Sequence, residues 1–492
     1  MVTRRQFLSA IPLALGAQPR RRPNIVFILT DDQTINDMSC YGNRILRTPH
    51  MDRIAHEGAR FNNCFVTNSL CAPSRASILT GCYSHIHGIR GNSEAADAVE
   101  KMTPGIATYP ELLRSAGYRT AMIGKWHLSH DPAGFDHWCI LPGQGVYNDP
   151  EFIENGKRKQ FKGYATDLTT DFAIEFLKTA VAEKDKPFLM VYQHKAPHRP
   201  FTPAARHAHM FDDDDLPYPK TFDDDYATRK VAKEAQDMRF DLSIAGDYKD
   251  LPPNLTPAAR KKWLYQRFVK DRYRAVYGVD ENLGRVLKFL DENHLADDTL
   301  ILYSSDNGFF EGEHGWYDKR FMYEPSMRVP LLARYPRAIK GGQVLDAAVL
   351  NIDFAPTMLD YAGVPIPKQM QGASLRPLFE GKSKSWRKSV YYAYYENSWV
   401  LLGATKEKMA DPSFAYFTAH RVGPHRGVRT DRYKLIEYYS DGDYWEFFDL
   451  KSDPDELTNQ YGNSAYAAPV RKLKRELRRL RNLYKDIKYI AP

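Results

Sequence analysis

Residues 24–32 read Asn-Ile-Val-Phe-Ile-Leu-Thr-Asp-Asp, a continuous apolar run that ends in two adjacent carboxylates. Continuous rather than alternating apolar residues are typical of a strand that is buried on both faces of a sheet. Three later segments, at 118–124, 187–192 and 299–305, repeat the pattern of a short apolar run followed by polar residues. These four segments predict a sheet whose two faces are both covered.

Segments with helical spacing lie between the apolar runs, at residues 108–116, 167–182 and 268–293. Helices that alternate with buried strands predict an α/β fold with a largely parallel sheet. Sites in such folds lie at the carboxyl ends of the strands. A polar turn explains any one cluster at these ends, but four clusters of metal-ligand and acid–base residues together predict a site. The clusters are Asp31 with Asp32, Lys125 with His127, His194 with His198, and Asp306 with Asn307.

The residue pattern of the sequence changes after about residue 375, where aromatic residues become frequent. Aromatic-rich segments at 391–395, 427–438 and 444–450 are typical of antiparallel strands. A helix with apolar residues at three- and four-residue spacing follows at 467–488. The C-terminal part therefore predicts an antiparallel sheet with a terminal helix.

The N-terminal residues 1–22 are interpreted as a signal peptide and linker. Arg4 and Arg5, a short apolar stretch and a small residue follow one another in the order of a twin-arginine signal; the alternative is a disordered basic tail. We therefore expect a protein exported by the twin-arginine route of a bacterium, to the periplasm or the medium. The rest of the chain is expected to divide into a catalytic domain at 23–375 and a smaller subdomain at 376–492.

The formal net charge of +8 arises at the two ends of the chain. The leader has five arginines and no acid, and the terminal helix has nine lysines or arginines and two acids, so the main body is mildly acidic. This balance argues against nucleic-acid binding. No apolar run reaches the length of about 18 residues that a membrane span requires, so no span is expected.

Five cysteines occur, and an odd number in an exported protein predicts one with a special role. If Cys71 is that residue, the other four form two disulfides in one of three ways or remain free thiols, which we favour. These four are Cys40, Cys64, Cys82 and Cys139.

Cys71 opens a segment that has the signals of a helix start and a helix end. Pro73 suits the first turn, and Gly81 suits the C-terminal cap. A helix N-terminus favours an anion because its first N–H groups have no partner within the helix. On these grounds alone, Cys71 is either an activated thiolate or a buried small residue.

The pattern Cys-Ala-Pro-Ser-Arg at 71–75, followed by Leu-Thr-Gly at 79–81, resembles the signature of the formylglycine-dependent type I sulfatases. Within that family the chain is most similar to the N-acetylglucosamine-6-sulfatases and the bacterial mucin-desulfating sulfatases. The segments that carry this similarity are 141–145, 195–199, 312–320 and 351–357. The resemblance implies an alkaline-phosphatase-like fold with a large mixed, mostly parallel sheet between helices. It also implies that a formylglycine-generating or sulfatase-maturing enzyme oxidises Cys71 to formylglycine.

Asp31, Asp32, Asp306 and Asn307 offer only oxygen ligands, which suit a hard cation such as Ca²⁺ or Mg²⁺ better than zinc. A turn by itself explains the Asp306-Asn307 pair. Two adjacent carboxylates after a buried strand are harder to explain without a cation, because unpaired buried charge is costly. The resemblance favours Ca²⁺, with the modified residue 71 completing the ligand set.

The resemblance also implies roles for the basic residues. Lys125 and Lys319 match the family's sulfate-binding lysines, and Arg75 matches the arginine that steadies the modified residue. One hydroxyl of the formylglycine hydrate is expected to attack sulfur while His198 gives a proton to the leaving alcohol. His127 is expected to remove the proton from the second hydroxyl, so that the aldehyde forms again and sulfate leaves.

His194 and His425 are candidate substrate contacts, and the alternative for His194 is a structural role. His425 begins a segment in which Arg426 stands where the resembling family has tyrosine, which either adds a contact to a second anionic group or is trivial. The expected function is hydrolysis of a sulfate ester on a glycan, with the 6-O-sulfate of N-acetylglucosamine favoured. The alternatives are a phosphonate or phosphodiester hydrolase of the same superfamily and a catalytically dead glycan-binding protein.

Overall fold

The structure of the chain is a computed structural model. It describes residues 22–92, 100–183, 185–235, 238–395, 422–439 and 444–487. The expected signal peptide at 1–22 lies outside the described residues except for Arg22.

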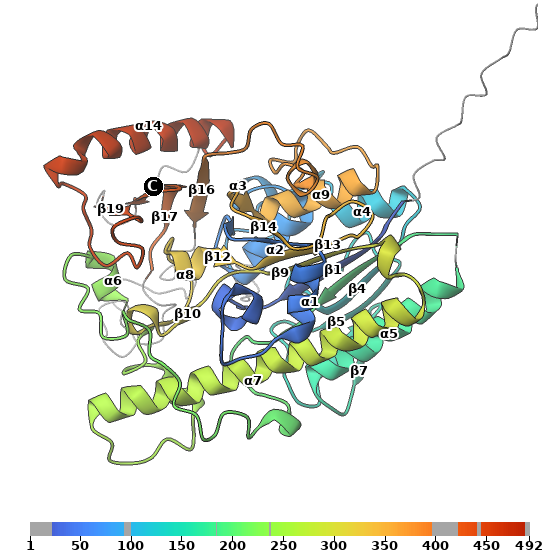
Figure 1. Cartoon of the computed structure of the whole chain (residues 1–492), viewed down its shortest axis with the longest axis horizontal. Coiled ribbons are helices and arrows are strands. Elements are labelled where there is room, and N and C mark those ends of the chain that lie inside the picture. Colours follow the sequence, from blue (N-terminus) through green and yellow to red (C-terminus); the bar gives the residue numbers. More distant parts are fainter. Residues whose placement is uncertain are drawn as a thin grey trace, which may run out of the picture.

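A ten-stranded mixed sheet forms the centre of the molecule (Figure 1). From one edge to the other its strands are β14 (Gln343–Leu345), β2 (Ala59–Phe61), β13 (Leu331–Arg334), β9 (Thr299–Ser305), β1 (Asn24–Thr30), β8 (Phe188–Gln193), β4 (Arg119–Lys125), β5 (His137–Leu141), β6 (Glu151–Glu154) and β7 (Lys157–Gln160). The five central strands, from β9 to β5, are parallel to one another. Antiparallel pairs occur on either side of them. The prediction of a mixed, mostly parallel sheet is therefore confirmed.

Helices cover both faces of this sheet (Figure 1). One face carries α1 (Pro49–Glu57), α5 (Ala165–Ala182) and α7 (Pro257–Glu292), and the other carries α2 (Cys71–Thr80), α4 (Tyr109–Ser115) and α9 (Phe354–Tyr361). Successive side chains of β1 point to opposite faces. Ile25 and Phe27 pack into the core beside α2 and α9, while Val26 and Ile28 pack into the core beside α5 and α7. Two-sided burial is why this strand is apolar throughout.

The predicted helices are present, but α7 begins earlier than expected, at Pro257 rather than at residue 268. Thr256 caps its N-terminus, because its side chain accepts a hydrogen bond from the N–H of Ala259 at 3.2 Å. Proline at the first position suits a helix start.

The C-terminal sheet is antiparallel and has the order β16 (Ser389–Tyr394), β17 (His425–Thr430), β18 (Tyr433–Tyr438) and β19 (Tyr444–Asp449). The aromatic run at 427–438 is therefore two strands joined by a turn. Helix α14 (Ala467–Leu483) packs on this sheet through Leu473, Leu477 and Leu480 (Figure 1). The predicted C-terminal sheet and terminal helix are confirmed, although α14 ends before residue 488.

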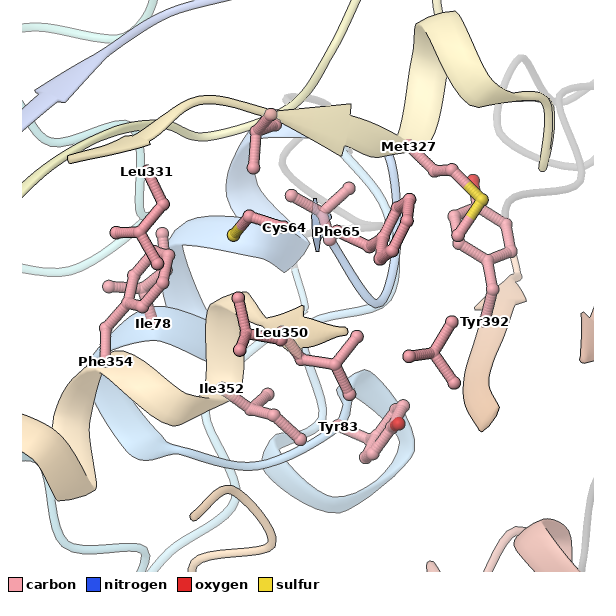
Figure 2. Packing of buried hydrophobic residues seen from close by; sticks show 14 of the residues in the cluster. Cys64, Phe65, Ile78, Tyr83, Met327, Leu331, Leu350, Ile352, Phe354 and Tyr392 are labelled. Carbon is pink, nitrogen blue, oxygen red and sulfur yellow. The ribbon is translucent and has the colours of Figure 1, made fainter. Parts of the chain in front are cut away.

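Short elements connect these parts. They are β3 (Cys64–Phe65), β10 (Phe310–Glu311), β11 (Tyr317–Asp318), β12 (Arg328–Val329), β15 (Val349–Leu350), α3 (Ser84–His87), α6 (Lys230–Glu234), α8 (Glu324–Met327) and α10 (Arg376–Phe379). Figure 2 shows how apolar residues such as Phe65, Ile78 and Leu350 pack between α2 and the small sheet of β12, β3 and β15. Helix α2 is thereby enclosed by protein.

The structure has no disulfide among the five cysteines, all of which lie in its described part, so Cys40, Cys64, Cys82 and Cys139 are free thiols, as predicted. In the part of the chain that the structure describes, no helix has both the length and the apolar character to cross a membrane.

Candidate active site

Cys71 is the first residue of α2, as the sequence predicted. Gly81 caps the other end in the left-handed conformation (φ 63°), where its N–H donates to the carbonyl of Ser77 at 2.9 Å. All ten residues of the helix are buried. The position of the Cys71 side chain is therefore set by the packing of the whole helix.

Three carboxylates gather beside Cys71. Asp31 and Asp32 follow β1, and Asp306 follows β9, which is the parallel neighbour of β1, so the two strand ends coincide. One oxygen from each of the three carboxylates lies within 4.8 Å of the others. The thiol of Cys71 is 3.5 Å from Asp31 Oδ1.

Two lysines pair with these carboxylates. Lys125, the last residue of β4, forms an ion pair with Asp31, and Lys319 forms one with Asp32. Lys319 Nζ also lies 3.2 Å from the sulfur of Cys71. Both ammonium groups are buried, so water screens their charges only weakly and they interact strongly with other charges in the site.

Arg75 joins three strand ends from its place one turn along α2. Its Nε donates to Asp306 Oδ2 at 2.9 Å. Its Nη1 donates to the carbonyl of Lys125 at 2.7 Å and to the side-chain oxygen of Gln193 at 2.6 Å. The planar guanidinium therefore fixes α2 relative to β9, β4 and β8.

The pKa values show how burial and charge oppose each other here. Burial raises the pKa of Asp306 to about 7, and the negative charge of Asp31 adds to this effect. Burial alone would raise the pKa of Asp31, but Lys125 and the other nearby cations lower it well below its usual value. Burial also raises the pKa of the Cys71 thiol to about 12. Burial therefore favours the protonated form of the unmodified thiol over the activated thiolate.

His198 and His127 border the same space. His198 Nδ1 donates to the carbonyl of Arg199 at 2.8 Å, which turns Nε2 toward Asp32 Oδ2, 3.8 Å away. Burial, with Lys125 next in importance, lowers the pKa of His198 well below its usual value. His127 lies after β4 with a positive φ of 52°. Its ring nitrogen Nε2 is 3.1 Å from the side-chain nitrogen of Gln144.

Gln144 and Lys195 also belong to the site, although neither was predicted to have a role there. Gln144 accepts a hydrogen bond from Lys125 Nζ at 2.7 Å and contacts His127. Lys195 donates to the carbonyls of Gln144 and Arg199, both at 3.1 Å, and burial lowers its pKa to about 7. A neutral amide in a loop has no chemical signature in a sequence. The only available signal was that both residues lie in segments that carry the family resemblance.

The structure corrects the expectation that His194 binds substrate. Its neighbour Gln193 points to Arg75, so the alternation of β8 turns His194 to the other face of the sheet. The imidazole is buried against Tyr192, with ring centres 4.4 Å apart. Neither ring nitrogen has a hydrogen-bond partner among the described residues. His194 is a core residue.

His425 is also misassigned by the sequence analysis. Its side chain is fully buried. Nε2 accepts a hydrogen bond from the N–H of Met322 at 3.1 Å, and Nδ1 donates to the carbonyl of Gly423 at 2.9 Å. Both ring nitrogens are therefore engaged by backbone, and neither is left for a substrate.

The side chains beside Cys71 form a set of oxygen donors that suits a metal ion. Asp31, Asp32 and Asp306 present only carboxylate oxygens. The side-chain oxygen of Asn307 is buried and has no hydrogen-bond partner among the described residues, while its nitrogen donates to Asp32. An amide oxygen left without a donor beside three carboxylates fits a hard divalent cation.

Comparisons with known proteins find relatives along most of the chain. The family model described as Sulfatase matches residues 23–364, and the model described as N-sulphoglucosamine sulphohydrolase, C-terminal, matches residues 312–483. A Bacteroides thetaiotaomicron protein named N-acetylglucosamine-6-O-sulfatase is 43% identical, over 97% of this chain and 90% of its own. A Homo sapiens protein named N-acetylglucosamine-6-sulfatase is 31% identical, over 89% of this chain and 81% of its own.

A solved structure gives the same result. The protein BT4656, in complex with its substrate D-glucosamine-2-N,6-O-disulfate, is 42% identical to this chain and superimposes with a TM-score of 0.85. The match covers 95% of this chain and 99% of that one. These comparisons do not favour a phosphodiester hydrolase or a catalytically dead glycan-binding protein.

Proposed function

This chain belongs to the sulfatase family, and within that family we propose that it removes the 6-O-sulfate from N-acetylglucosamine units of a sulfated glycan. The activity is hydrolysis of a sulfate ester. The choice of sugar rests on the two relatives named for it, which match most of the chain. The observation that carries the proposal is the convergence of three carboxylates and two buried lysines on Cys71.

Residue 71 is the proposed source of the nucleophile. A thiol with a pKa of about 12 is a poor nucleophile near pH 7. Oxidation of Cys71 by a maturing enzyme of the host would give the aldehyde formylglycine. Addition of water to this aldehyde would give a hydrate with one hydroxyl as the nucleophile and a second hydroxyl through which sulfate can be released. Arg75 would hold α2, and with it residue 71, against the strand ends.

Asp31, Asp32, Asp306 and Asn307 are the proposed ligands of a divalent cation, with Ca²⁺ favoured. When bound, the cation would supply a positive charge that offsets the charge on the sulfate and holds the nucleophilic oxygen.

The protein's own cations would bind the sulfate. Lys319 lies beside residue 71, and Lys125 pairs with Asp31. Both ammonium groups have little exposure to water and therefore attract an anion more strongly than surface lysines do. Gln144 would keep Lys125 in place.

His198 is proposed to donate a proton to the leaving alcohol, and His127 to accept one from residue 71. The hydrogen bond from Nδ1 of His198 to Arg199 leaves Nε2 as the nitrogen that faces the site. A bound sulfate ester adds negative charge beside this ring, which raises the pKa of the imidazole and favours its protonated form.

The proposal includes the surroundings of the enzyme. A leader of the twin-arginine type at 1–22 would export the protein from a bacterium, where the sulfated glycan would be its partner. Two of the relatives are named extracellular sulfatases or their homologues. The division into a catalytic domain at 23–375 and a C-terminal subdomain at 376–492 is part of the same proposal.

The first test concerns residue 71. We expect Cys71→Ala to abolish turnover while the protein keeps the thermal stability of the unchanged chain. The peptide that contains residue 71, taken from active protein, should be lighter than its cysteine form by the exchange of sulfur and two hydrogens for oxygen. Full activity in protein whose peptide carries only unmodified cysteine would contradict the assignment.

The second test concerns the substrate. N-acetylglucosamine 6-O-sulfate should be hydrolysed with a higher kcat/KM than its 3-O- or 4-O-sulfated counterpart. A second comparison uses esters of one aryl alcohol: its sulfate ester against its phosphate monoester and phosphodiester. A preference for the phosphodiester would favour the other hydrolase class, and equal rates on all the sugars would remove the 6-O-sulfate assignment.

A further inference from the structure

Lys319 sits in a backbone that is strained on both sides. Asp318 and Arg320 have positive φ angles of 83° and 92°, in a region that residues other than glycine rarely adopt. Such conformations persist only where the surroundings hold them, and they cluster at functional sites. The Lys319 ammonium is buried between Asp32 and Cys71, so a small relaxation of this backbone would move it.

One hydroxyl group from the C-terminal sheet holds this segment. Tyr392, on β16, donates its O–H to the carbonyl of Arg320 at 2.5 Å. The same oxygen accepts a hydrogen bond from the N–H of Ser69 at 3.2 Å. Ser69 lies two residues before Cys71, and Arg320 lies one residue after Lys319. The donor and the acceptor functions of a single hydroxyl thus connect the two segments that place the sulfur and the ammonium 3.2 Å apart.

The tyrosine itself is fixed. Its side chain is fully buried, and Figure 2 shows it extending from β16 toward Met327 at the edge of the packed core. The imidazole of His425 stacks on its ring, with centres 5.6 Å apart and planes at 25°. His425 also accepts the N–H of Met322, so it supports both Tyr392 and the Lys319 segment.

Further contacts continue along the same segment. Tyr323 donates its hydroxyl to Glu446 of β19 at 2.8 Å. Glu324 pairs with Lys434 of β18 at 2.9 Å and with Arg429 of β17 at 3.1 Å. Three strands of the C-terminal sheet therefore hold residues 322–324, and Tyr392 of β16 is the contact next to Lys319.

We propose that Tyr392 is a positioning residue, whose hydroxyl sets the distance between residue 71 and Lys319. This inference rests on the proposed function, because it assumes that Lys319 binds the sulfate that residue 71 attacks. It assigns the C-terminal sheet a part in catalysis without any contact to the reacting atoms. Removal of the hydroxyl removes both of these hydrogen bonds, to the carbonyl of Arg320 and from the N–H of Ser69, so we expect the two segments to move apart.

The test is Tyr392→Phe, which removes one oxygen and keeps the ring. We expect kcat to fall about ten- to a hundred-fold, the loss typical of a small displacement in an active site. Tyr391→Phe is the matched control, because Tyr391 is an equally buried neighbour on β16 whose hydroxyl donates to Asp486 instead. The control should keep the kcat of the unchanged enzyme.

Lys319→Ala shows whether Tyr392 acts through Lys319. On an activated aryl sulfate, we expect Tyr392→Phe to change kcat less than about threefold in the Lys319→Ala background, because the two residues act as one unit. An equal loss in both backgrounds, or the same loss in Tyr391→Phe, would overturn the inference. Full activity of Lys319→Ala alone would instead contradict the proposed role of Lys319.

Amide hydrogen exchange gives a readout that needs no turnover. Peptides that cover residues 65–72 and 317–324 should exchange faster in Tyr392→Phe than in Tyr391→Phe. Unchanged exchange in both peptides, together with an unchanged kcat, would show that the hydroxyl does not hold the two segments.

Discussion

Arg75 shows how much a single residue supports in this site. Its guanidinium is 2% exposed and satisfies the carboxylate of Asp306, the carbonyl of Lys125 and the amide of Gln193. An unpaired carboxylate in so buried a place is costly, because water cannot replace the lost partner. Arg75 therefore stabilises the fold as well as the site.

We expect Arg75→Ala to lower the free energy of unfolding by about 3–5 kcal/mol, the usual cost of removing one partner of a buried ion pair. Arg75→Lys should lose less, since it keeps the charge but not the planar fork. Urea unfolding measures both. The control is Arg53→Ala, whose partners Glu57 and Asp291 are partly exposed, for which the expected loss is about 1 kcal/mol or less. Equal losses for the two arginines would contradict this view of Arg75.

Among the elements, the close contact of β4 with β8 determines where Lys125 lies. Gly124 precedes Lys125 and has a φ of 101°. A Cβ atom at this position would lie 1.8 Å from the backbone oxygen of Gln193. Glycine is therefore required both by the backbone conformation and by the neighbouring strand.

Gly124→Ala should lower the free energy of unfolding by about 3 kcal/mol or more, because strain and overlap with a backbone atom add together. Gly117 is a matched control, since it has a similar φ of 92° but no atom within 4 Å of the added Cβ. For Gly117→Ala the expected cost is only the left-handed conformation, about 1–2 kcal/mol. Urea unfolding measures the loss in the free energy of unfolding for both variants. Equal losses would show that β8 moves to make room for the added Cβ atom.

At the scale of the whole molecule, buried neutral histidines contribute to how stability depends on pH. His87 Nδ1 accepts the N–H of Ile89 at 3.1 Å and its Nε2 lies 3.0 Å from Ser77 Oγ, while both nitrogens of His425 are engaged by backbone. Each ring has one nitrogen that faces an N–H donor and cannot take a proton in place. Burial lowers the pKa of His87 to about 3 and that of His425 to about 4.

The contribution of these two histidines to stability should therefore fall as the pH is lowered. Below an unfolded pKa of about 6.5 these histidines bind protons in the unfolded chain but not in the folded chain, so their contribution to the free energy of unfolding decreases from about pH 6.5 toward pH 4. His87→Asn keeps a hydrogen-bond acceptor and does not titrate. Urea unfolding between pH 4.5 and 7 gives the free energy of unfolding as a function of pH. The slope of this dependence should be smaller in the variant than in the unchanged protein, by the equivalent of about one bound proton. An unchanged slope would mean that His87 takes up a proton in the folded state.

Several features were readable from the sequence because they depend on neighbouring residues. Alternate side chains of β1 enter two cores, so a continuous apolar run was enough to predict a buried strand. Pro73 and Gly81 marked the start and the end of α2. The polar residues after β1, β4 and β9 were predicted to meet, and they do, because parallel strands place their carboxyl ends at one edge.

The tertiary structure alone decided the roles that depend on direction and burial. Histidines 194, 198 and 425 are alike in the sequence, but only His198 faces the carboxylates, since strand alternation and the C-terminal sheet bury the other two. Gln144 and Tyr392 act through contacts with segments that are distant in the sequence. A local sequence pattern cannot predict such contacts. The sequence by itself determined the fold class and the chemical groups of the site around Cys71. The packing between distant segments decided which of those groups face one another, because a side chain's direction and its burial are properties of the assembled fold.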